Sequence, residues 1–431
     1  MKIIEGFEAA KKVLSRLATP QNVSGQEERE SVVRGIIEDV RQRGDAALLE
    51  YTAKFDHARL ASLEVSQTQI KKAYQKVDPE VISALKLAAD RITVFHKAQR
   101  KALRNKVNLP GLSQLVRPLE RVGVYVPGGT ASYPSTVLMT AIPARVAGVK
   151  EIILVTPPQV DGQISPLTLA AANIAGVDRV FAVGGAQAIA ALAFGTESIP
   201  RVDKICGPGN IFVTLAKKLV YGVVGIDGLA GPSEVLIIAD DSADPADCAA
   251  DLLAQAEHDA MASAVMVTTS HSLADRVKRE IVKQLKDLPR KETVAESLAS
   301  QGIIAVVDGM DEAIELANLY APEHLCLMMD KADAYVTRLT NAACIITGKK
   351  ATVVIGDYVA GPSHVLPTGG TARFSSPLNV MDFLKLTNVI NVDEVSLGEL
   401  GRAAEILARA EGLEAHARSI HERLKSLRRK H

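Results

Sequence analysis

From about residue 121 to residue 375, short runs rich in valine and isoleucine alternate with segments of helical periodicity. This alternation is typical of parallel strands joined by crossover helices, so it predicts an α/β fold. Two successive groups of such units, at about 126–234 and 235–375, favour two Rossmann-like, doubly wound domains, with a closed barrel as the alternative. The expected strands are RVGVYV at 121, EIILV at 151, VDRVFAV at 177, VDKIC at 202, EVLIIAD at 234, SAVMVTTS at 263, GIIAVVD at 302 and ACIITG at 343.

The two ends of the chain are expected to be helical extensions, because apolar residues recur there every three or four positions between charged ones. Residues 1–20 are predicted to form an N-terminal helical arm, and residues 376–431 a helical tail that acts as a docking element. Residues 21–125 and 235–375 are assigned to a first α/β domain that carries most candidate catalytic residues. Residues 126–234 are assigned to a second α/β domain.

Composition narrows the class of partner. The 431 residues are 47% hydrophobic, which suffices for a large core. The net charge is +0, so neither a nucleic acid nor an anionic membrane is favoured, and a small-molecule partner is expected. No apolar run approaches the roughly 18 residues that span a bilayer, and the N-terminus does not resemble a signal peptide. The widely spaced Cys206, Cys248, Cys326 and Cys344 predict reduced thiols and a cytoplasmic protein.

Four glycine-rich turns lie close together between residues 127 and 234: PGGTASYPST at 127, GGAQ at 184, GPGN at 207 and AGPSE at 230. Several of them follow an expected strand and precede a helix. At that position, glycine lets main-chain N–H groups and a helix N-terminus approach a phosphate, so a nucleotide could bind there. The G-x-G-x-x-G fingerprint is absent, however, and the glycines could serve turn geometry alone.

Two pairs of polar residues could carry metal or acid–base chemistry. Gln255 and His258 lie three positions apart at the end of an expected helix, so they could share one ion; a solvated helix end is the alternative. Glu323 and His324 lie where a helix meets a buried strand. They could move protons, or His324 could satisfy free carbonyl groups at the helix end.

Further candidates lie toward the C-terminus. Asp357 follows an apolar run that is expected to be a strand, and His364 lies in a loop rich in glycine and proline; both could instead cap and turn the chain. His416 shares a helical stripe with apolar residues, where a core or interface histidine is the alternative, and Glu411 begins the same helix. Periodicity cannot bring distant side chains together. A zinc site with oxygen and nitrogen ligands is the resulting hypothesis, with the ligands Gln255, His258, Asp357 and His416.

The motifs PGGTASYPSTVLMTAIPARVAG, GGAQAIAALAFGTESIPRVDKICGPGN, GPSEVLIIAD, LLAQAEHD, APEHL, GPSHVLPTGG and EGLEAHA make this sequence closely similar to the histidinol dehydrogenase family. They occur in the family's order and spacing, and the similarity runs from about Pro127 to the C-terminal helix. The resemblance implies oxidation of L-histidinol to L-histidine, the last step of L-histidine biosynthesis. It also implies two NAD⁺ used in sequence, and one Zn²⁺ per site.

The resemblance also implies roles for individual residues. Glu323 and His324 would be catalytic, with His324 as the general base and Glu323 activating water. The zinc ligands would be Gln255, His258, Asp357 and His416. Substrate contacts would come from these six residues together with Ser233, His364 and Glu411, and NAD contacts from Tyr125, Gln187 and Asn210. The family further implies a homodimer, in which the C-terminal helix carries Glu411 and His416 into the partner's site.

Three other functions are compatible with parts of the pattern. An enzyme of the aldehyde dehydrogenase type would use Cys206 as a thiolate, although only Lys204 suggests a group that could activate it. A zinc hydrolase would use the same ligands without a nucleotide. A non-catalytic nucleotide-binding or assembly protein would hold a structural zinc, but such sites are mostly rich in cysteine.

Overall fold

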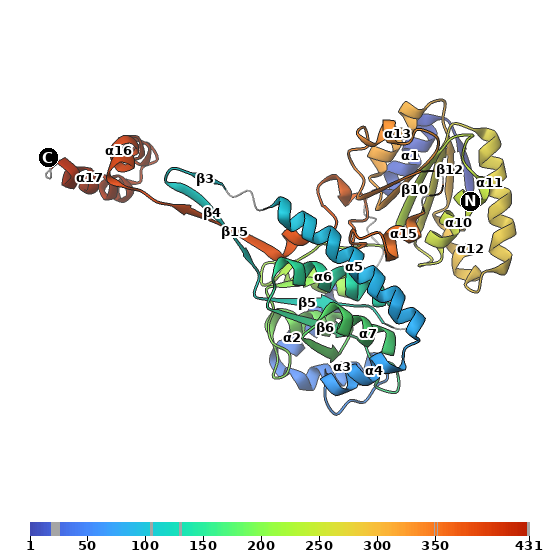
Figure 1. The fold of residues 1–431 in the computed structure, drawn as a ribbon, viewed down its shortest axis with the longest axis horizontal. Helices are drawn as coiled ribbons and strands as arrows, with labels where there is room; N and C mark the ends of the chain where they lie inside the picture. The colour runs from blue at the N-terminus through green and yellow to red at the C-terminus, as the bar shows by residue number, and fades with distance from the viewer. Residues whose placement is uncertain (19–25, 104–106, 129–131, 349, 351, 429–431) are drawn as a thin grey trace. The chain divides into compact units, whose positions relative to one another are not determined.

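The computed structural model describes residues 1–18, 26–103, 107–128, 132–348, 350 and 352–428. The chain divides into two compact units, which are described separately (Figure 1). Unit 1 comprises Met1–Arg100 and Leu119–Phe383, and unit 2 comprises Lys101–Pro118 and Leu384–His431. None of the helices among the described residues combines the length and the apolar character needed to span a bilayer.

The first sheet of unit 1 has six strands in the order β1-β12-β11-β10-β13-β14, and every neighbouring pair is parallel. Its strands are β1 (Lys2–Glu5), β10 (Glu234–Ala239), β11 (Ser263–Thr268), β12 (Ile303–Val306), β13 (His324–Met328) and β14 (Cys344–Thr347). The accompanying helices are α1 (Phe7–Leu17), α10 (Pro245–Ala256), α11 (His271–Gln284), α12 (Lys291–Ser300), α13 (Met310–Tyr320), α14 (Asp333–Val336) and α15 (Val353–Tyr358).

Strand β10 shows why this sheet is buried on both faces. Its residues alternate between the two faces, so Val235 and Ile237 pack with side chains of α10, α11 and α12. Leu236 and Ile238 pack on the opposite face with side chains of α1 and α13. A strand covered by helices on both sides needs apolar residues at every position, which explains the uninterrupted run in EVLIIA.

The second sheet of unit 1 also has six strands, in the order β2-β7-β6-β5-β8-β9, and only the β2–β7 pair is antiparallel. Its strands are β2 (Glu64–Val65), β5 (Arg121–Tyr125), β6 (Glu151–Thr156), β7 (Arg179–Ala182), β8 (Lys204–Cys206) and β9 (Gly225–Ile226). Its helices are α2 (Gln26–Arg43), α3 (Asp45–Phe55), α4 (Gln67–Lys76), α5 (Pro79–Ala102), α6 (Pro134–Ala147), α7 (Pro166–Ala175), α8 (Gly185–Phe194) and α9 (Ile211–Val220).

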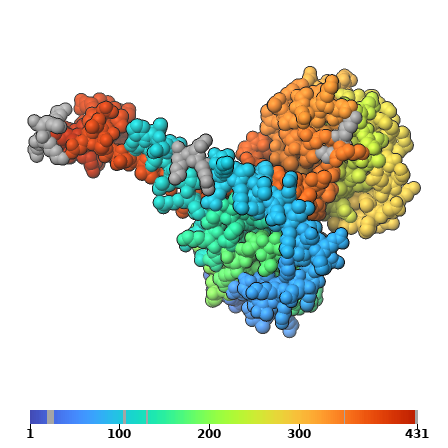
Figure 2. All heavy atoms as spheres, viewed as in Figure 1, coloured from blue at the N-terminus to red at the C-terminus, as the bar shows by residue number. Residues whose placement is uncertain are grey.

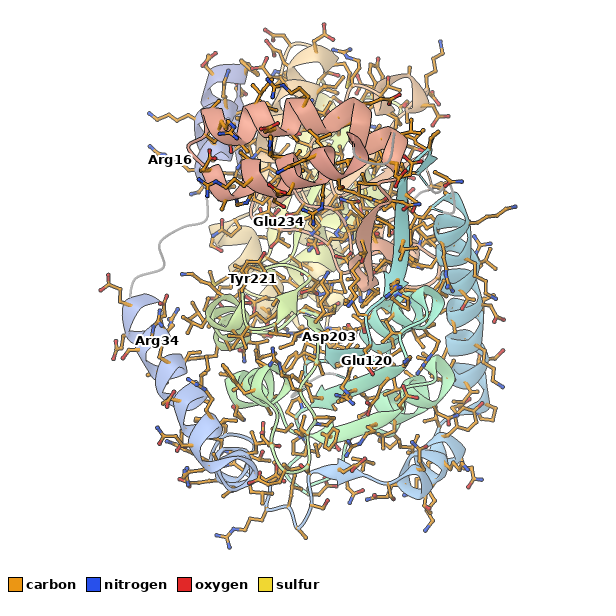
Figure 3. The ribbon with its side chains drawn as sticks, turned by 90° about the vertical axis from the view of Figure 1, so that its left-hand side faces the viewer. Arg16, Arg34, Glu120, Asp203, Tyr221 and Glu234 are labelled. Atoms are coloured by element: carbon orange, nitrogen blue, oxygen red, sulfur yellow. The ribbon has the colours of Figure 1, made fainter. Side chains whose placement is uncertain are left out.

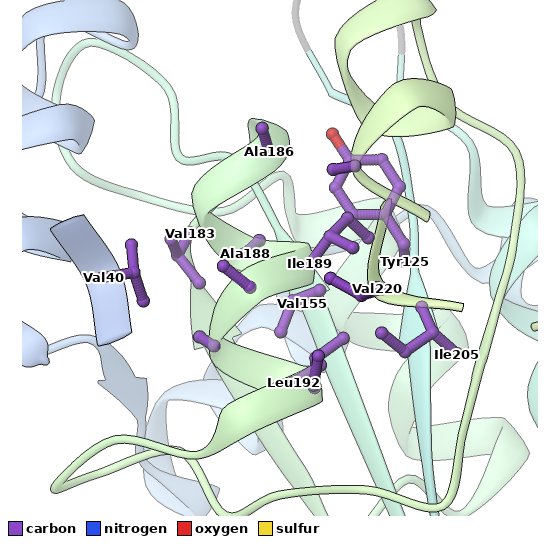
Figure 4. Close-up of a cluster of buried hydrophobic side chains, with 14 of the residues drawn as sticks. Val40, Tyr125, Val155, Val183, Ala186, Ala188, Ile189, Leu192, Ile205 and Val220 are labelled. Atoms are coloured by element: carbon purple, nitrogen blue, oxygen red, sulfur yellow. The ribbon is translucent and has the colours of Figure 1, made fainter. Parts of the chain in front are cut away.

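A large apolar core holds the helices of this half against the second sheet. Figure 4 shows Val40 of α2 facing Val183 and Ala188 at one side of α8, while Ile189 and Leu192 of α8 lie toward Val155 of β6. The close approach of α8 requires a glycine in the central strand, because a Cβ atom at Gly123 would lie 2.7 Å from a methyl group of Leu192. The outer face of α5 lies on the surface of unit 1 (Figure 2).

The two open, mostly parallel sheets confirm the predicted α/β fold, and the alternative of a closed barrel is wrong. The predicted domain boundaries differ from the structure. Residues 21–125 were expected to join residues 235–375; residues 21–25 lie outside the described residues, but α2 packs against α8 and α9, and β5 is a central strand of the second sheet. The expected N-terminal arm is partly wrong too, because Lys2–Glu5 forms an edge strand beside β12 before α1 begins.

Unit 2 consists of a β-ribbon and a helical hairpin. Its elements are β3 (Asn108–Leu109), β4 (Leu112–Pro118), β15 (Leu384–Ile390), α16 (Glu394–Ala410) and α17 (Glu414–Arg428). Strand β15 pairs antiparallel with β4. The prediction that the chain is only helical after residue 376 is therefore wrong for the residues of β15. The two helices pack closely where Gly401 faces Leu424, and the buried Glu405 is paired with Arg409 and His421.

Candidate functional site

The predicted acid–base residues lie at the amino end of β13, next to the amino end of the neighbouring strand β10. Helix α13 ends at Ala321, whose left-handed conformation (φ 53°) turns the chain back toward the sheet. Glu323 follows in the turn, and His324 is the first residue of β13, in register with Val235 of β10. Both side chains are buried, which fits groups that work out of contact with bulk water.

His324 lies close to two carboxyl groups and is hydrogen-bonded to one of them, Asp357. Its Nε2 lies 3.1 Å from Oδ1 of Asp357, and its Nδ1 lies 3.8 Å from Oε2 of Glu323. Burial opposes the charged imidazolium, but the hydrogen bond to Asp357 and the charge of Glu323 outweigh it and raise the pKa of His324 to about 9. The same pairing lowers the pKa of Asp357 against the effect of burial. The site therefore holds an imidazole whose basicity depends on the Asp357 carboxylate.

Burial opposes the ionisation of the Glu323 carboxyl group. Its Oε2 accepts a hydrogen bond of 2.8 Å from the main-chain N–H of Glu234. Burial raises the pKa of Glu323 to about 7, although the charge of His324 and this hydrogen bond act in the opposite direction. A carboxyl group that titrates near neutral pH suits proton transfer to and from water.

Asp357 lies on a helix, which corrects one expectation. The apolar run before it was expected to be a strand, but Val353–Tyr358 forms α15, whose N-terminus is capped by the hydroxyl group of Thr352. The preceding strand, β14, already occupies the edge position of the sheet, and the cap starts a helix after it. The main-chain carbonyl of Asp357 accepts a 2.8 Å hydrogen bond from Nδ1 of His364. Helix and loop are thereby fixed to each other.

A cavity of about 340 Å³ opens beside these groups. Its lining includes His324, Asp357, His364 and the half-buried Cys344. Burial lowers the pKa of His364, and Nε2 of this imidazole lies 3.3 Å from Oγ1 of Thr136 on α6. The cavity is large enough for a small molecule and presents acid–base groups on one side.

Gln255 and His258 lie where α10 ends, as predicted. The helix is capped at its N-terminus by Asp244 and ends at Ala256, so His258 lies just beyond it, with its N–H bonded to the Gln255 carbonyl. The Gln255 amide nitrogen is buried and has no hydrogen-bond partner among the residues that the structure describes. Burial lowers the pKa of His258, while the charge of Asp357 acts against this, so both groups belong to one electrostatic environment.

The remaining predicted residues are placed as follows. Ser233 is half-buried next to the start of β10, and its carbonyl accepts a hydrogen bond from the N–H of Ser263. Glu411 and His416 are exposed residues of the helical hairpin in unit 2. Across the described residues, no three or more His, Cys, Asp or Glu side chains are grouped so that they could hold a metal ion. The assignments of these residues as ligands or substrate contacts remain predictions.

The three residues predicted to contact NAD line one cavity of about 980 Å³ in unit 1. The hydroxyl group of Tyr125, at the end of β5, accepts a hydrogen bond of 3.2 Å from the N–H of Gly185. Gln187 is buried in the first turn of α8. Asn210 caps α9 by accepting hydrogen bonds from two main-chain N–H groups. These residues follow three different strands of the second sheet, at the carboxyl ends where nucleotides bind in such folds.

Cys206 does not have the properties of a nucleophile. It is fully buried in β8, and burial raises its pKa well above that of an ordinary thiol. Lys204, the only local group that suggested activation, instead forms an ion pair of 2.9 Å with Asp382. Catalysis by a thiolate needs the opposite shift, so the structure disfavours the aldehyde dehydrogenase alternative.

Glu234 was not among the site residues predicted from the sequence. This carboxyl group is buried at the start of β10, and burial raises its pKa to about 8. Its signal in the sequence was an acidic residue at the head of a wholly apolar strand, directly after Ser233. Thr136 was also missed, because nothing in its own segment indicates the contact with His364.

Fold and site define an α/β protein with a buried acid–base cluster and a separate cavity of nucleotide size. The family model for histidinol dehydrogenase matches residues 19–424. The chain is 57% identical to histidinol dehydrogenase from Dehalococcoides mccartyi strain CBDB1 over 435 aligned positions, covering 98% of this chain and 100% of that protein. Identity to the protein of that name from Lactiplantibacillus plantarum is 51%, with 98% and 99% covered. The crystal structure of histidinol dehydrogenase from Elizabethkingia anophelis superposes with a TM-score of 0.93 at 38% identity, covering 99% of each chain. The chain belongs to the histidinol dehydrogenase family.

Proposed function

We propose that this protein is an NAD-dependent, zinc-assisted dehydrogenase that converts L-histidinol through L-histidinaldehyde to L-histidine, the last step of L-histidine biosynthesis. Membership of the family supports the substrate. The observation that carries the reaction type is the buried Glu323–His324–Asp357 cluster beside a cavity for a small molecule. Two oxidations in sequence require a base for an alcohol and a group that activates water, and this cluster offers both.

In the first oxidation, His324 would remove the hydroxyl proton of the alcohol, and NAD⁺, when bound, would accept the hydride from the same carbon atom. A neutral imidazole is needed for this step. The pairing with Asp357 keeps His324 protonated at neutral pH, so engagement of the Asp357 carboxylate by another partner would lower the pKa of His324 and prepare it as the base.

In the second oxidation, Glu323 accepts a proton from the water that adds to the aldehyde carbon, while His324 returns the proton taken from the alcohol to the aldehyde oxygen, giving a gem-diol. The neutral His324 would then remove a hydroxyl proton of the gem-diol, a second NAD⁺, when bound, would accept the hydride, and the resulting carboxylic acid would ionise to the carboxylate product. The position of Glu323 next to His324 supports this division of work, because the two groups are close enough to exchange protons through the substrate or a water molecule.

Zinc would be held by Gln255, His258, Asp357 and His416. The chemistry of the donors fits this metal, because they offer one amide, two imidazoles and one carboxylate. The terminal amide of Gln255 also has a buried nitrogen without a hydrogen-bond partner among the described residues. Rotation of this amide by 180° would bring its oxygen, the atom that can bind a metal, to the unpaired position. Bound zinc would polarise the alcohol C–O bond and hold the substrate amine.

NAD would bind in the 980 Å³ cavity, in contact with Tyr125, Gln187 and Asn210. Exposed apolar side chains on its rim support this choice, since Phe55 is 48% and Phe212 39% exposed and could cover an adenine ring. We also propose a homodimer in which Glu411 and His416 of one subunit complete the partner's site. The four free cysteines fit the cytoplasmic location predicted from the sequence.

The test is the yield of NADH from L-histidinol, followed by absorbance before chelation, after chelation and after zinc is added back. We expect two NADH per histidinol, loss on chelation and recovery with zinc. A yield of one NADH would contradict the second oxidation. The absence of any NADH with metal restored would overturn the function and favour a zinc hydrolase or a non-catalytic protein.

A further inference from the structure

Glu234 is a buried acidic residue of the site to which the proposed mechanism gives no task. It is the first residue of β10 and only 7% exposed, and Figure 3 labels its position in unit 1. Its Oε2 atom is enclosed by protein without a hydrogen-bond partner among the described residues. Burial of an unpaired carboxylate is costly, so a carboxyl group in such a place calls for an explanation.

Glu234 makes one hydrogen bond on each side of itself. Its main-chain N–H donates to Oε2 of Glu323 at 2.8 Å. Its side-chain Oε1 accepts from the N–H of Gly369 at 2.9 Å. Three residues earlier, the N–H of Gly231 donates to Oγ1 of Thr368 at 2.6 Å. Residues 231–234 therefore join the water-activating carboxyl group to the chain segment that follows His364.

That segment is held at both of its ends. At one end, His364 is bonded to the carbonyl of Asp357. At the other end, Gly369 and Gly370 both have positive φ angles (61° and 73°), a conformation that suits glycine. At Gly370 a Cβ atom would also lie 2.6 Å from the carbonyl oxygen of Ala18, so the backbone there has little room to move.

We propose that Glu234 is a positioning residue: its main-chain N–H and its uncharged carboxyl group together hold Glu323 against the segment of residues 364–370. This inference rests on the proposed function. An uncharged partner is required because Glu323 must ionise to take a proton from water, and a second negative charge beside it would oppose that ionisation. Burial raises the pKa of Glu234 to about 8, in keeping with an uncharged group at neutral pH.

The test compares Glu234→Gln, Glu234→Ala and Glu234→Asp, with NADH production measured separately from L-histidinol and from L-histidinaldehyde. Because Glu323 acts only on the aldehyde, the variants Glu234→Ala and Glu234→Asp should slow aldehyde oxidation about 10- to 100-fold. The same variants should slow alcohol oxidation less than about 3-fold. Gln keeps the acceptor oxygen without charge and should restore aldehyde oxidation to within about 3-fold of wild type.

A matched control is Tyr320→Phe, which removes a buried 2.8 Å hydrogen bond to Ser263 at the start of the neighbouring strand β11. It should alter neither oxidation. Thermal unfolding shows which variants fold. If Glu234→Ala does not fold, the comparison of Glu234→Gln with Glu234→Asp still tests the role of Glu234.

The possible results separate this inference from the proposed function. A wild-type protein that forms no NADH overturns the function itself. An active wild type overturns the role of Glu234 alone if Ala and Asp leave the aldehyde step intact or slow both steps equally. The same conclusion follows if Gln is as slow as Asp.

Discussion

At the level of single residues, the site combines three groups whose protonated forms are favoured by the fold. The pKa values of Glu323, Glu234 and His324 are raised to about 7, 8 and 9. For the two carboxyl groups the leading cause is burial, and for His324 it is the hydrogen bond to Asp357 against the effect of burial. The native state therefore binds more protons than the unfolded chain, so these groups make stability fall as pH rises.

The first prediction concerns the stability of Glu234→Gln. The raised pKa of Glu234 means that its contribution is fully present below the unfolded value near 4.5 and is lost as pH rises through about 8. Gln cannot ionise, so we expect the variant to gain stability relative to wild type between pH 5 and pH 8, on the order of a few kcal/mol. Urea unfolding at both pH values measures this difference. A difference that does not change with pH would contradict it.

The second prediction separates the two oxidations. Glu323→Gln removes the group that accepts a proton from water but leaves His324 in place. We expect alcohol oxidation to continue and aldehyde oxidation to slow at least about 100-fold, as the loss of a general base does. The yield should fall from two NADH to one per histidinol, with aldehyde captured by a hydrazine trap. His324→Asn is the comparison, and it should slow both steps.

At the level of elements, most strands from β5 to β14 were predictable because each is an apolar run with a recognisable turn on either side, whereas the two-residue strand β9 was not predicted. Strands β1 and β15 were missed because they are edge strands with polar faces, and their partners β12 and β4 lie hundreds of residues away in the chain. An edge strand needs no long apolar run, so its sequence pattern does not distinguish it from an amphipathic helix.

Candidate site residues were recognisable by chemical type but not by arrangement. Glu323 and His324 could be placed at a strand start from their own segment. Their contact with Asp357 depends on α15, and the helix in turn depends on Thr352 and on the strand order of the first sheet. Such distant contacts leave no periodic signal in a single sequence, so Glu234 was overlooked until its neighbour strand was known.

The third prediction tests the role of α15. The Thr352 hydroxyl accepts from the N–H of Val354 and donates to Asp251 on α10 at 2.6 Å, so it connects two elements that carry proposed zinc ligands. Thr352→Val should lower the free energy of unfolding by about 2 kcal/mol. It should also raise the zinc concentration needed to restore activity after chelation about 10-fold or more.

The cap of α4 provides the control for this experiment. Ser66 caps that helix in a capping box with Gln69, far from the site in sequence and in a different layer of unit 1. Ser66→Ala should cost about 1 kcal/mol of stability and leave the zinc requirement unchanged. If both variants shift the zinc requirement equally, general destabilisation explains the effect and the specific role of α15 is contradicted.

At the level of the whole molecule, the proposed zinc ligands are divided between the two units. Gln255, His258 and Asp357 belong to unit 1, whereas His416 is exposed on the helical hairpin of unit 2. That hairpin also exposes large apolar side chains, with Leu400 at 64% and Leu407 at 62%. A small unit with such a surface is expected to be covered in the working assembly, and a second copy of the chain is the proposed cover.

The last prediction follows from this arrangement and uses mixed dimers. A His416→Ala subunit keeps its own Glu323, and a Glu323→Ala subunit keeps its own His416. If the sites are shared, each mixed dimer contains one intact site. Half of the dimers formed by random co-assembly are mixed, so about a quarter of wild-type activity should return from two inactive parents. The control mixes Glu323→Ala with His324→Ala, whose lesions lie on the same unit and should give no recovery. Activity that stays absent in the first mixture, with mixed dimers shown by mass spectrometry, would place His416 in the site of its own subunit.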